Sequence, residues 1–189
     1  MFEALSKMEG PFLLWVQETL RGGAADSVVS FYTKLGNAGM LWIALCILCL
    51  VFPKTRRAGI AGALALLMSL LLTNGIIKHL AARTRPWLVV EGLIPLVAEH
   101  DPNSFPSGHT SAAFAAACAW QHTLPERWMR VTVWIMAVCM GLSRLYVGVH
   151  FPTDVLCGTL VGILCGQLGW CLLRICENRL GWKKQKHGR

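Results

Sequence analysis

Long apolar stretches separated by short polar connections make up most of this chain. Residues 35–53, 58–77 and 155–173 contain no charged side chain. A helix needs about 20 apolar residues to cross the ~30 Å hydrocarbon core of a bilayer. Each of the three stretches therefore predicts a helix that spans a membrane.

Two further stretches, at about residues 108–124 and 128–147, are weaker candidates for membrane spans. The second carries an arginine near each end, and these charges must reach the interface or be sheltered inside the protein. In the last of the strong spans, Gly158, Gly162 and Gly166 recur at every fourth position. Such a stripe of small residues predicts the close approach of another helix.

The first 23 residues mix apolar and charged side chains and are too polar to cross a bilayer. Residues 1–23 therefore predict an amphipathic helix that lies in the membrane interface. Residues 24–176 would form a transmembrane domain, and residues 177–189 a basic cytoplasmic tail. The expected fold is all-α, a polytopic transmembrane helical bundle of about five spans plus the interfacial helix, with six spans also possible.

Composition supports a membrane protein and excludes several other classes. Of the 189 residues, 54% are hydrophobic and 15% are charged, whereas soluble domains have roughly 45–50% and 25%. A soluble globule, a disordered chain and a disulfide scaffold do not fit these values. The cysteines lie in or beside apolar stretches, and the pair Cys46 and Cys49 has no second pair at zinc-site spacing. We therefore expect no metal site and no cofactor.

The basic excess predicts an orientation in the membrane. Lys and Arg total 18 against 10 Asp and Glu, a net charge of +8. Because no nucleic-acid-binding motif is visible, we attribute this excess to membrane orientation and anionic headgroups. One side of the expected bundle receives more of the Lys and Arg residues, including the tail, and the positive-inside rule places it in the cytoplasm. The C-terminus would then be cytoplasmic, and the loop at 81–107 would face outward.

Three groups of polar residues lie beside span ends on the outward side, where polar side chains at membrane depth are costly and need a reason. The groups are Lys78 with Arg85 and Pro86; Pro106, Ser107, Gly108 and His109; and Ser143, Arg144, His150 and Asp154. Because each group is near a span end on one membrane face, folding can bring all three together.

The combination predicts a site for a multiply charged oxyanion. Lys78, Arg85 and Arg144 supply three cations, and the two guanidinium groups suit bidentate contacts with phosphate. Residues 107–109 open a predicted helix, where free N–H groups and the positive end of the helix dipole favour an anion. Phosphate is the ligand that fits these features.

Two histidines beside such a site suggest phosphoryl transfer. His150 and Asp154 are four residues apart, which can place the carboxylate against one imidazole nitrogen and leave the other free to attack. His109 has no carboxylate at helical spacing, so it is the better candidate to protonate the leaving oxygen. Arg83 stays ambiguous, because no spacing requirement selects it.

Polar and aromatic residues of the outward loop are harder to interpret. They are Trp87, Glu91, Glu99, His100 and Asp101. These side chains could gate the site or select headgroups, and they could equally be solvated loop residues, which is the more common case.

The three groups resemble the signature of the type 2 phosphatidic acid phosphatase and vanadium haloperoxidase superfamily. That pattern is Lys, six residues, Arg-Pro; then Pro-Ser-Gly-His; then Ser-Arg, five residues, His, three residues and Asp. The chain matches it at every specified position, from Lys78 to Pro86, from Pro106 to His109 and from Ser143 to Asp154. The resemblance covers about residues 26–176.

The resemblance implies a helical bundle with a phosphate site at the outer membrane face and hydrolysis without a metal ion. It implies that His150 is the nucleophile and forms a phosphohistidine, that Asp154 is its partner and that His109 is the general acid. It assigns phosphate binding to Lys78, Arg85, Ser107, Gly108 and Arg144. Membrane members commonly have six spans, one more than the five expected here.

The leading hypothesis is a membrane lipid phosphatase that hydrolyses a lipid phosphate or diphosphate. Candidate substrates are undecaprenyl diphosphate, phosphatidylglycerol phosphate and phosphatidate, with a preference for the first two because the chain is small. One alternative is haloperoxidase chemistry on bound vanadate, and another is a non-catalytic phospholipid-binding or transport protein that retains the pocket. The expected partners are the lipid substrate and the bilayer, and the oligomeric state is left open.

Overall fold

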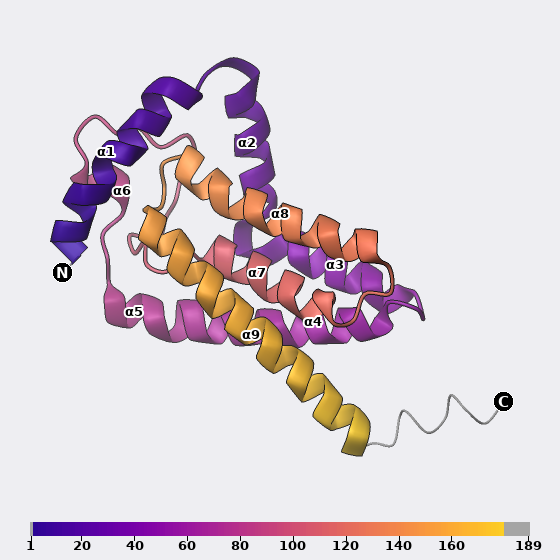
Figure 1. Ribbon diagram of the computed structural model, residues 1–189. Helices are drawn as coiled ribbons and strands as arrows, with labels where there is room; N and C mark the ends of the chain where they lie inside the picture. Colours follow the sequence, from indigo (N-terminus) through magenta and orange to yellow (C-terminus); the bar gives the residue numbers. More distant parts are fainter. Residues whose placement is uncertain (1, 180–189) are drawn as a thin grey trace.

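A short alanine-rich helix, α7 (Gly108–Gln121), lies at the centre of the fold. In the computed structural model, which describes residues 2–179, it packs against α4 (Arg56–Ser69), α8 (Arg127–Tyr146) and α9 (Pro152–Arg179) (Figure 1). Nearly every side chain of α7 from its third residue onward is buried. The bundle therefore forms around this helix, and the first turn of α7 opens at one end of the bundle.

Close contact between α7 and α9 depends on the predicted stripe of glycines. A Cβ atom added at Gly158 would lie 2.7 Å from the Ser107 carbonyl oxygen, and one added at Gly162 would lie 2.5 Å from the Ser111 carbonyl oxygen. At Gly166 it would lie 2.5 Å from Cβ of Cys118. Side chains at these three positions would push the helices apart, so the prediction of close helix approach is confirmed.

A sharp bend interrupts the apolar stretch at 35–53. The chain forms α2 (Gly23–Leu35), a 3-10 turn η1 (Asn37–Gly39) and α3 (Met40–Val51), and the two helical parts meet at 54°. Gly39 has a φ of 73°, a left-handed conformation that ends a helix easily at glycine. The span expected over this stretch is therefore not confirmed as one continuous helix, and it counts as a span only if α2 and α3 cross the membrane together.

After α3, the chain forms α4, and this helix continues without a break into a π-helical segment. This segment, η2 (Leu70–Ile77), leads into α5 (Lys78–Ala81), and a single turn of helix, α6 (Pro86–Val89), follows. π-Helical turns inside α-helices occur frequently at functional sites. Here the segment ends directly at Lys78, the first residue of the predicted phosphate site.

Within residues 2–179, three helices are long and apolar enough to cross a membrane. They are Arg56–Ala81, Arg127–Tyr146 and Pro152–Arg179, and the bent pair of α2 with α3 makes a fourth if it counts as one span. The 14 residues of α7 extend only about 21 Å, less than the bilayer core. The structure thus supports an all-helical membrane protein with three or four spans, and the expected number of about five is not confirmed.

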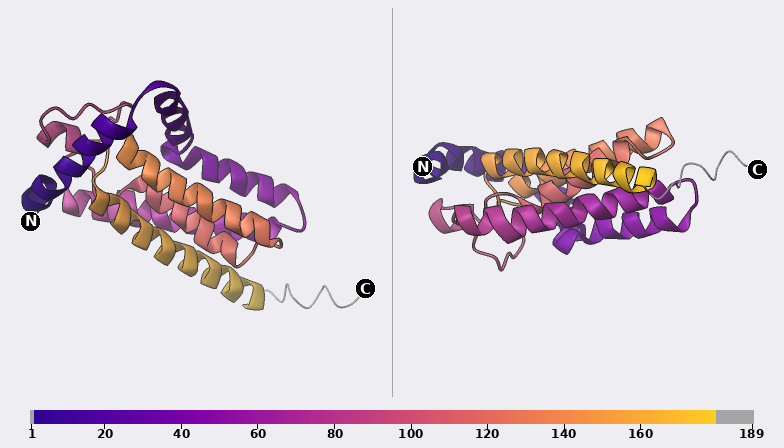
Figure 2. Two further views of the ribbon diagram at one scale, coloured as in Figure 1. Left: turned by 45° about the horizontal axis from the view of Figure 1, so that its top comes forward. Right: turned by 90° about the horizontal axis from the view of Figure 1, so that it is seen from below.

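The first helix, α1 (Phe2–Leu20), lies across one end of the bundle, and the C-terminal end of α9 lies at the opposite end (Figure 2). It buries Leu13 and Val16 against the protein and exposes Phe12 and Trp15, as expected of an amphipathic helix. At the other end of the chain, α9 runs to residue 179, and residues 180–189 of the expected tail lie outside the described residues.

Candidate active site

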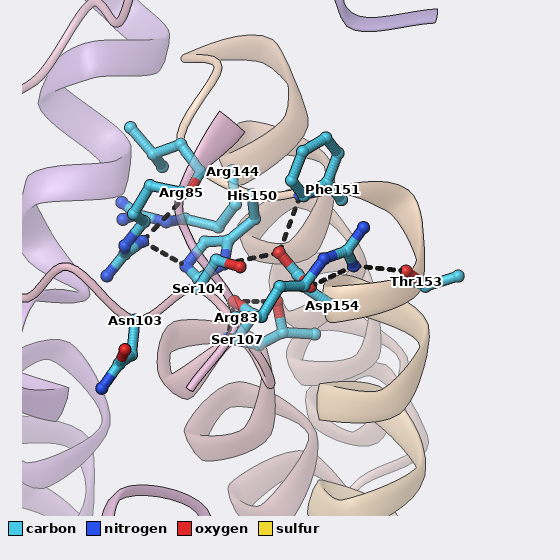
Figure 3. Close-up of polar contacts among 12 residues, drawn as sticks. Arg83, Arg85, Asn103, Ser104, Ser107, Arg144, His150, Phe151, Thr153 and Asp154 are labelled. Carbon is cyan, nitrogen blue, oxygen red and sulfur yellow. Dashed lines mark hydrogen bonds and ion pairs between the residues drawn. The ribbon is translucent and has the colours of Figure 1, made fainter. Parts of the chain in front are cut away.

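The three predicted groups of polar residues converge at the end of the bundle where α7 begins (Figures 1 and 3). Lys78, Arg85, Gly108, His109 and His150 line one cavity. The backbone N–H of Ser107 donates to the Asp154 carbonyl oxygen at 3.0 Å, which ties the start of α7 to the first turn of α9. Arg144 joins the group through Glu99, a carboxylate that it shares with Arg85.

His150 lies between Arg85 and Asp154, in the loop that connects α8 with α9. Its Nε2 is 3.0 Å from Nη1 of Arg85, and its Nδ1 is 3.4 Å from Oδ2 of Asp154 (Figure 3). A guanidinium group can only donate hydrogen bonds, so the contact assigns the lone pair to Nε2. The proton of the neutral ring is then on Nδ1, facing the carboxylate. This tautomer places the lone pair on Nε2, the nitrogen that accepts from Arg85 and that would have to attack if His150 is the nucleophile.

Burial keeps the His150 imidazole neutral. The side chain is almost fully enclosed, and this burial lowers its pKa well below the ordinary value, with further lowering by the positive charges of Arg85, Arg144 and Lys78. Burial also lowers the pKa of Arg85, and the negative charges of Glu99 and other carboxylates oppose that shift. At neutral pH the site therefore combines an unprotonated imidazole with fixed cations.

Asp154 is held in place by Arg83, a residue that sequence analysis could not assign. Nη1 of Arg83 is 2.7 Å from Oδ1 of Asp154, while Nη2 is 2.7 Å from Oε2 of Glu9 in α1. The guanidinium group also lies over the Phe151 ring, 4.0 Å from its centroid. The backbone N–H of Phe151 donates to Oδ2 of Asp154 at 2.9 Å. Both carboxylate oxygens are thus fixed in space.

His109 has a support of its own from another part of the chain. It is the second residue of α7, and its Nε2 is 3.0 Å from Oδ1 of Asn37 in the bend between α2 and α3. Ser107 caps the same helix, because its side-chain oxygen accepts from the N–H of Thr110. Neither Asn37 nor Glu9 belongs to a recognisable motif, so no sequence signal marked them.

The three cations of the site are each paired with oxygen atoms. Arg144 donates to Oγ1 of Thr33 in α2 at 2.7 Å and contacts Glu99. Lys78 forms an ion pair of 2.5 Å with Asp101. The expectation that Glu99 and Asp101 are solvated loop residues was wrong, because both carboxylates turn back into the site.

The remaining residues of that loop are arranged differently. Glu91 and His100 are exposed, in agreement with the expectation. The guanidinium group of Arg85 lies 5.6 Å from the centroid of the Trp87 ring, so this tryptophan packs beside the site.

The cavity extends from this polar end along an apolar wall. Its volume is about 660 Å³. Beyond the charged residues it is lined mainly by aliphatic side chains of α3, α4 and η2, including Ile43, Ile47, Leu50, Leu66 and Leu67. Several of these side chains are about half exposed on the outside of the bundle. The site therefore offers a charged pocket for a headgroup and an adjoining groove for an apolar chain.

Comparison with known families and proteins agrees with this geometry. Residues 58–176, well over half of the chain, match the model of the PAP2 superfamily. The undecaprenyl-diphosphatase of Sulfolobus acidocaldarius is 33% identical over 137 residues, which cover 72% of this chain and 65% of that protein. The chain thus spans slightly less than two thirds of the length of this relative.

Two solved structures share the fold. The crystal structure of Aquifex aeolicus LpxE superposes with a TM-score of 0.75 at 27% identity. The matched region covers 86% of this chain and 94% of the LpxE chain. The transmembrane PAP2-type phosphatidylglycerolphosphate phosphatase from Bacillus subtilis gives a TM-score of 0.71 at 27% identity. The matched region covers 98% of this chain and 90% of the Bacillus chain. In both cases the similarity extends over most of the helical bundle.

Proposed function

This chain belongs to the PAP2 superfamily, and from that membership and the geometry of its site we propose that it is a membrane phosphatase acting on lipid phosphates or diphosphates. The observation that carries the proposal is the cavity itself. Its charged end contains Lys78, Arg85, His109 and His150, and the same cavity continues along aliphatic side chains of α3 and α4. A phosphate group with a long apolar tail fits both parts at once.

The proposed reaction begins with attack by Nε2 of His150 on phosphorus. A P–N bond forms, the P–O bond to the leaving group breaks, and His109 donates a proton to the departing oxygen. Water then attacks the phosphohistidine, His109 accepts a proton from that water, and the P–N bond breaks. The products are the dephosphorylated lipid, inorganic phosphate and the regenerated enzyme.

Two sets of residues would lower the barrier. Asp154 stabilises the positive charge that develops on the His150 ring, since it lies against Nδ1. Lys78, Arg85 and Arg144, together with the backbone N–H groups of Gly108 and His109, would neutralise the phosphate oxygens throughout the reaction. Ser107 and Gly108 would bind the phosphate at the start of α7, where the glycine lets the ligand come close to the backbone. No step requires a metal ion or another cofactor.

Membrane topology supports a site at the extracytoplasmic face. The end of the bundle opposite to the site carries Lys54 in the α3–α4 connection and the basic residues that open α4 and α8, which are Arg56, Arg57, Arg127 and Arg130, and the positive-inside rule assigns such residues to the cytoplasm. The substrate would then be reached from the outer leaflet, with its tail lying against α3 and α4.

For the substrate, we propose a polyprenyl diphosphate such as undecaprenyl diphosphate, or phosphatidylglycerol phosphate. The names of the Sulfolobus and Bacillus relatives match these two lipids. Phosphatidate is a third candidate, because the groove places no visible requirement on the number of tails.

The decisive experiment measures release of inorganic phosphate by the purified protein in detergent, on each of the three lipids. We expect turnover that His150→Ala abolishes, and we expect brief incubation with a ³²P-labelled substrate to leave acid-labile label on the wild-type protein. An unchanged rate in His150→Ala would remove the mechanism. Lipid binding without turnover by the wild-type protein would instead support a non-catalytic phospholipid-binding protein.

A further inference from the structure

Two carboxylates occupy the positions where a phosphate group would be expected to bind. Glu99 contacts Nη2 of Arg144, and its Oε2 is 3.6 Å from Nη2 of Arg85. Oδ2 of Asp101 lies 2.5 Å from Nζ of Lys78. Both carboxylates come from one loop segment, and both line the cavity together with Lys78 and Arg85. Each cation of the site therefore already has an anionic partner within the protein.

Both side chains are accessible enough to leave these positions. The exposed fraction of the Glu99 side chain is 17% and that of Asp101 is 43%, while the guanidinium groups of Arg85 and Arg144 are almost fully buried. Burial would raise the pKa of Asp101, but hydrogen bonds from Lys78 and from the Asn103 backbone lower it overall. Asp101 is thus ionised at neutral pH, and the carboxylates rather than the cations are the movable partners.

The charges of this cluster distinguish between kinds of phosphate. Three cations and two carboxylates leave one net positive charge in the pocket. A phosphodiester brings one negative charge, so at Arg85 and Arg144 it would replace the Glu99 carboxylate by an equal charge and gain little. The displaced carboxylate would also remain nearby and repel it. A terminal phosphate carries about two negative charges at neutral pH, and a diphosphate carries more.

We infer that Glu99, assisted by Asp101, is a specificity-determining residue that excludes phosphodiesters from the site. A membrane contains phosphodiester lipids in large excess over any lipid phosphate, and their tails would fit the same apolar groove. Glu99 makes occupation of the cations conditional on a ligand with at least two negative charges. This inference rests on the proposed function, because it assumes that the cavity binds the phosphate group of a lipid.

The test compares competition by a phosphodiester lipid in three proteins. Farnesyl diphosphate serves as the substrate in mixed micelles, phosphatidylglycerol as the competitor, and diacylglycerol as a control for dilution of the substrate by lipid tails. We expect Glu99→Gln to lower the apparent Ki of phosphatidylglycerol about tenfold relative to the wild type, as expected when one nearby like charge is removed. Glu91→Gln removes the same charge from an exposed position of the same loop and should leave the Ki unchanged.

A binding measurement separates this inference from the proposed enzymatic activity. Titration calorimetry with pyrophosphate and with dimethyl phosphate reports affinity without turnover. We expect the preference for pyrophosphate to be strong in the wild type, reduced in Glu99→Gln and reduced to a smaller extent in Asp101→Asn. If pyrophosphate binds selectively but no lipid is hydrolysed, the proposed function fails and the selectivity stands. Equal preference in wild type and both variants, or an equal fall in Glu91→Gln, would overturn the inference.

Discussion

Arg83 and Asp154 form a fully buried ion pair, with 2.7 Å between Nη1 and Oδ1. The carboxylate of this pair faces Nδ1 of the proposed nucleophile, so the position of Asp154 sets the orientation of His150. On its other side, Arg83 is bound by Glu9 of α1. The pair thus connects an N-terminal helix to the His150 imidazole through two side chains.

We predict that Arg83→Gln lowers kcat about 10- to 100-fold, because a displaced Asp154 misorients His150. KM for farnesyl diphosphate should change little, since Arg83 is not part of the cavity lining. Arg83→Lys should recover part of the rate, because an ammonium group still pairs with Asp154. The control is Arg57→Gln, which removes the ion pair with Glu177 at the opposite end of the bundle. Equal losses of kcat in Arg83→Gln and Arg57→Gln would show that Arg83 acts only through stability.

The pH profile of kcat/KM should report the lowered pKa of His150. Only the neutral ring can attack, so activity falls as the pH drops through that pKa. Because burial, and after it Arg85, lowers the pKa, the acid limb should lie below pH 6.5, the ordinary value for histidine. Arg85→Gln removes one positive charge and should move the limb to higher pH. A limb at or above 6.5 in the wild type, or a downward shift in Arg85→Gln, would contradict this assignment.

The role of His109 as a proton donor can be separated from a structural role by the choice of leaving group. On an alkyl phosphate, His109→Ala should reduce kcat/KM by about 10²–10⁴-fold. On p-nitrophenyl phosphate the loss should be far smaller, because nitrophenolate departs without a proton. Asn37→Ala should show the same dependence in weaker form, since the amide holds the His109 ring. Equal losses on both substrates would indicate that His109 does not donate the proton.

Filling the apolar groove should impair long substrates selectively. Ile47→Trp and Leu67→Trp place a large ring in the lining of α3 or α4. We expect KM to rise for an undecaprenyl substrate and to stay constant for p-nitrophenyl phosphate. Leu160→Trp provides the matched control, because Leu160 is an exposed leucine on α9 outside the cavity lining. A similar rise of KM in that control would mean that the effect is not specific to the groove.

The residues of the signature could be predicted from the sequence because each group lies in a short local element at the end of a helix. His150 lies in the loop two residues before α9 and Asp154 lies in the first turn of that helix, and the positions 107–109 form the start of α7. The cavity lining then brings His109 and His150 together with the cations, as the sequence predicts. Their chemical roles remain proposals that the experiments above test.

The supporting residues could not be predicted, because each acts across a long stretch of chain. Glu9 reaches Arg83 and Asn37 reaches His109 only after folding, and no periodicity marks such pairs. Glu99 was misjudged for the same reason, since an acidic residue in a polar loop resembles any solvated one. Only the contacts with Arg85 and Arg144 distinguish it.

Hydropathy was also a limited guide to the spans. Hydropathy averages over short interruptions, so it did not indicate the turn at Asn37–Gly39, which lies in an uncharged stretch. It cannot separate burial in lipid from burial in protein, and α7 is apolar because α4, α8 and α9 enclose it. The length of a helix, which the structure provides, distinguishes these cases.

All residues of the signature lie within 58–176, yet His109, Arg144 and the Arg83 that pairs with Asp154 depend on side chains from the first 40 residues. Glu9, Thr33 and Asn37 hold Arg83, Arg144 and His109, respectively. A fragment restricted to the matched region would retain every residue of the signature and lack these anchors. Two homologues with identical signatures can consequently evolve different turnover rates through substitutions in an N-terminal segment that no motif search inspects.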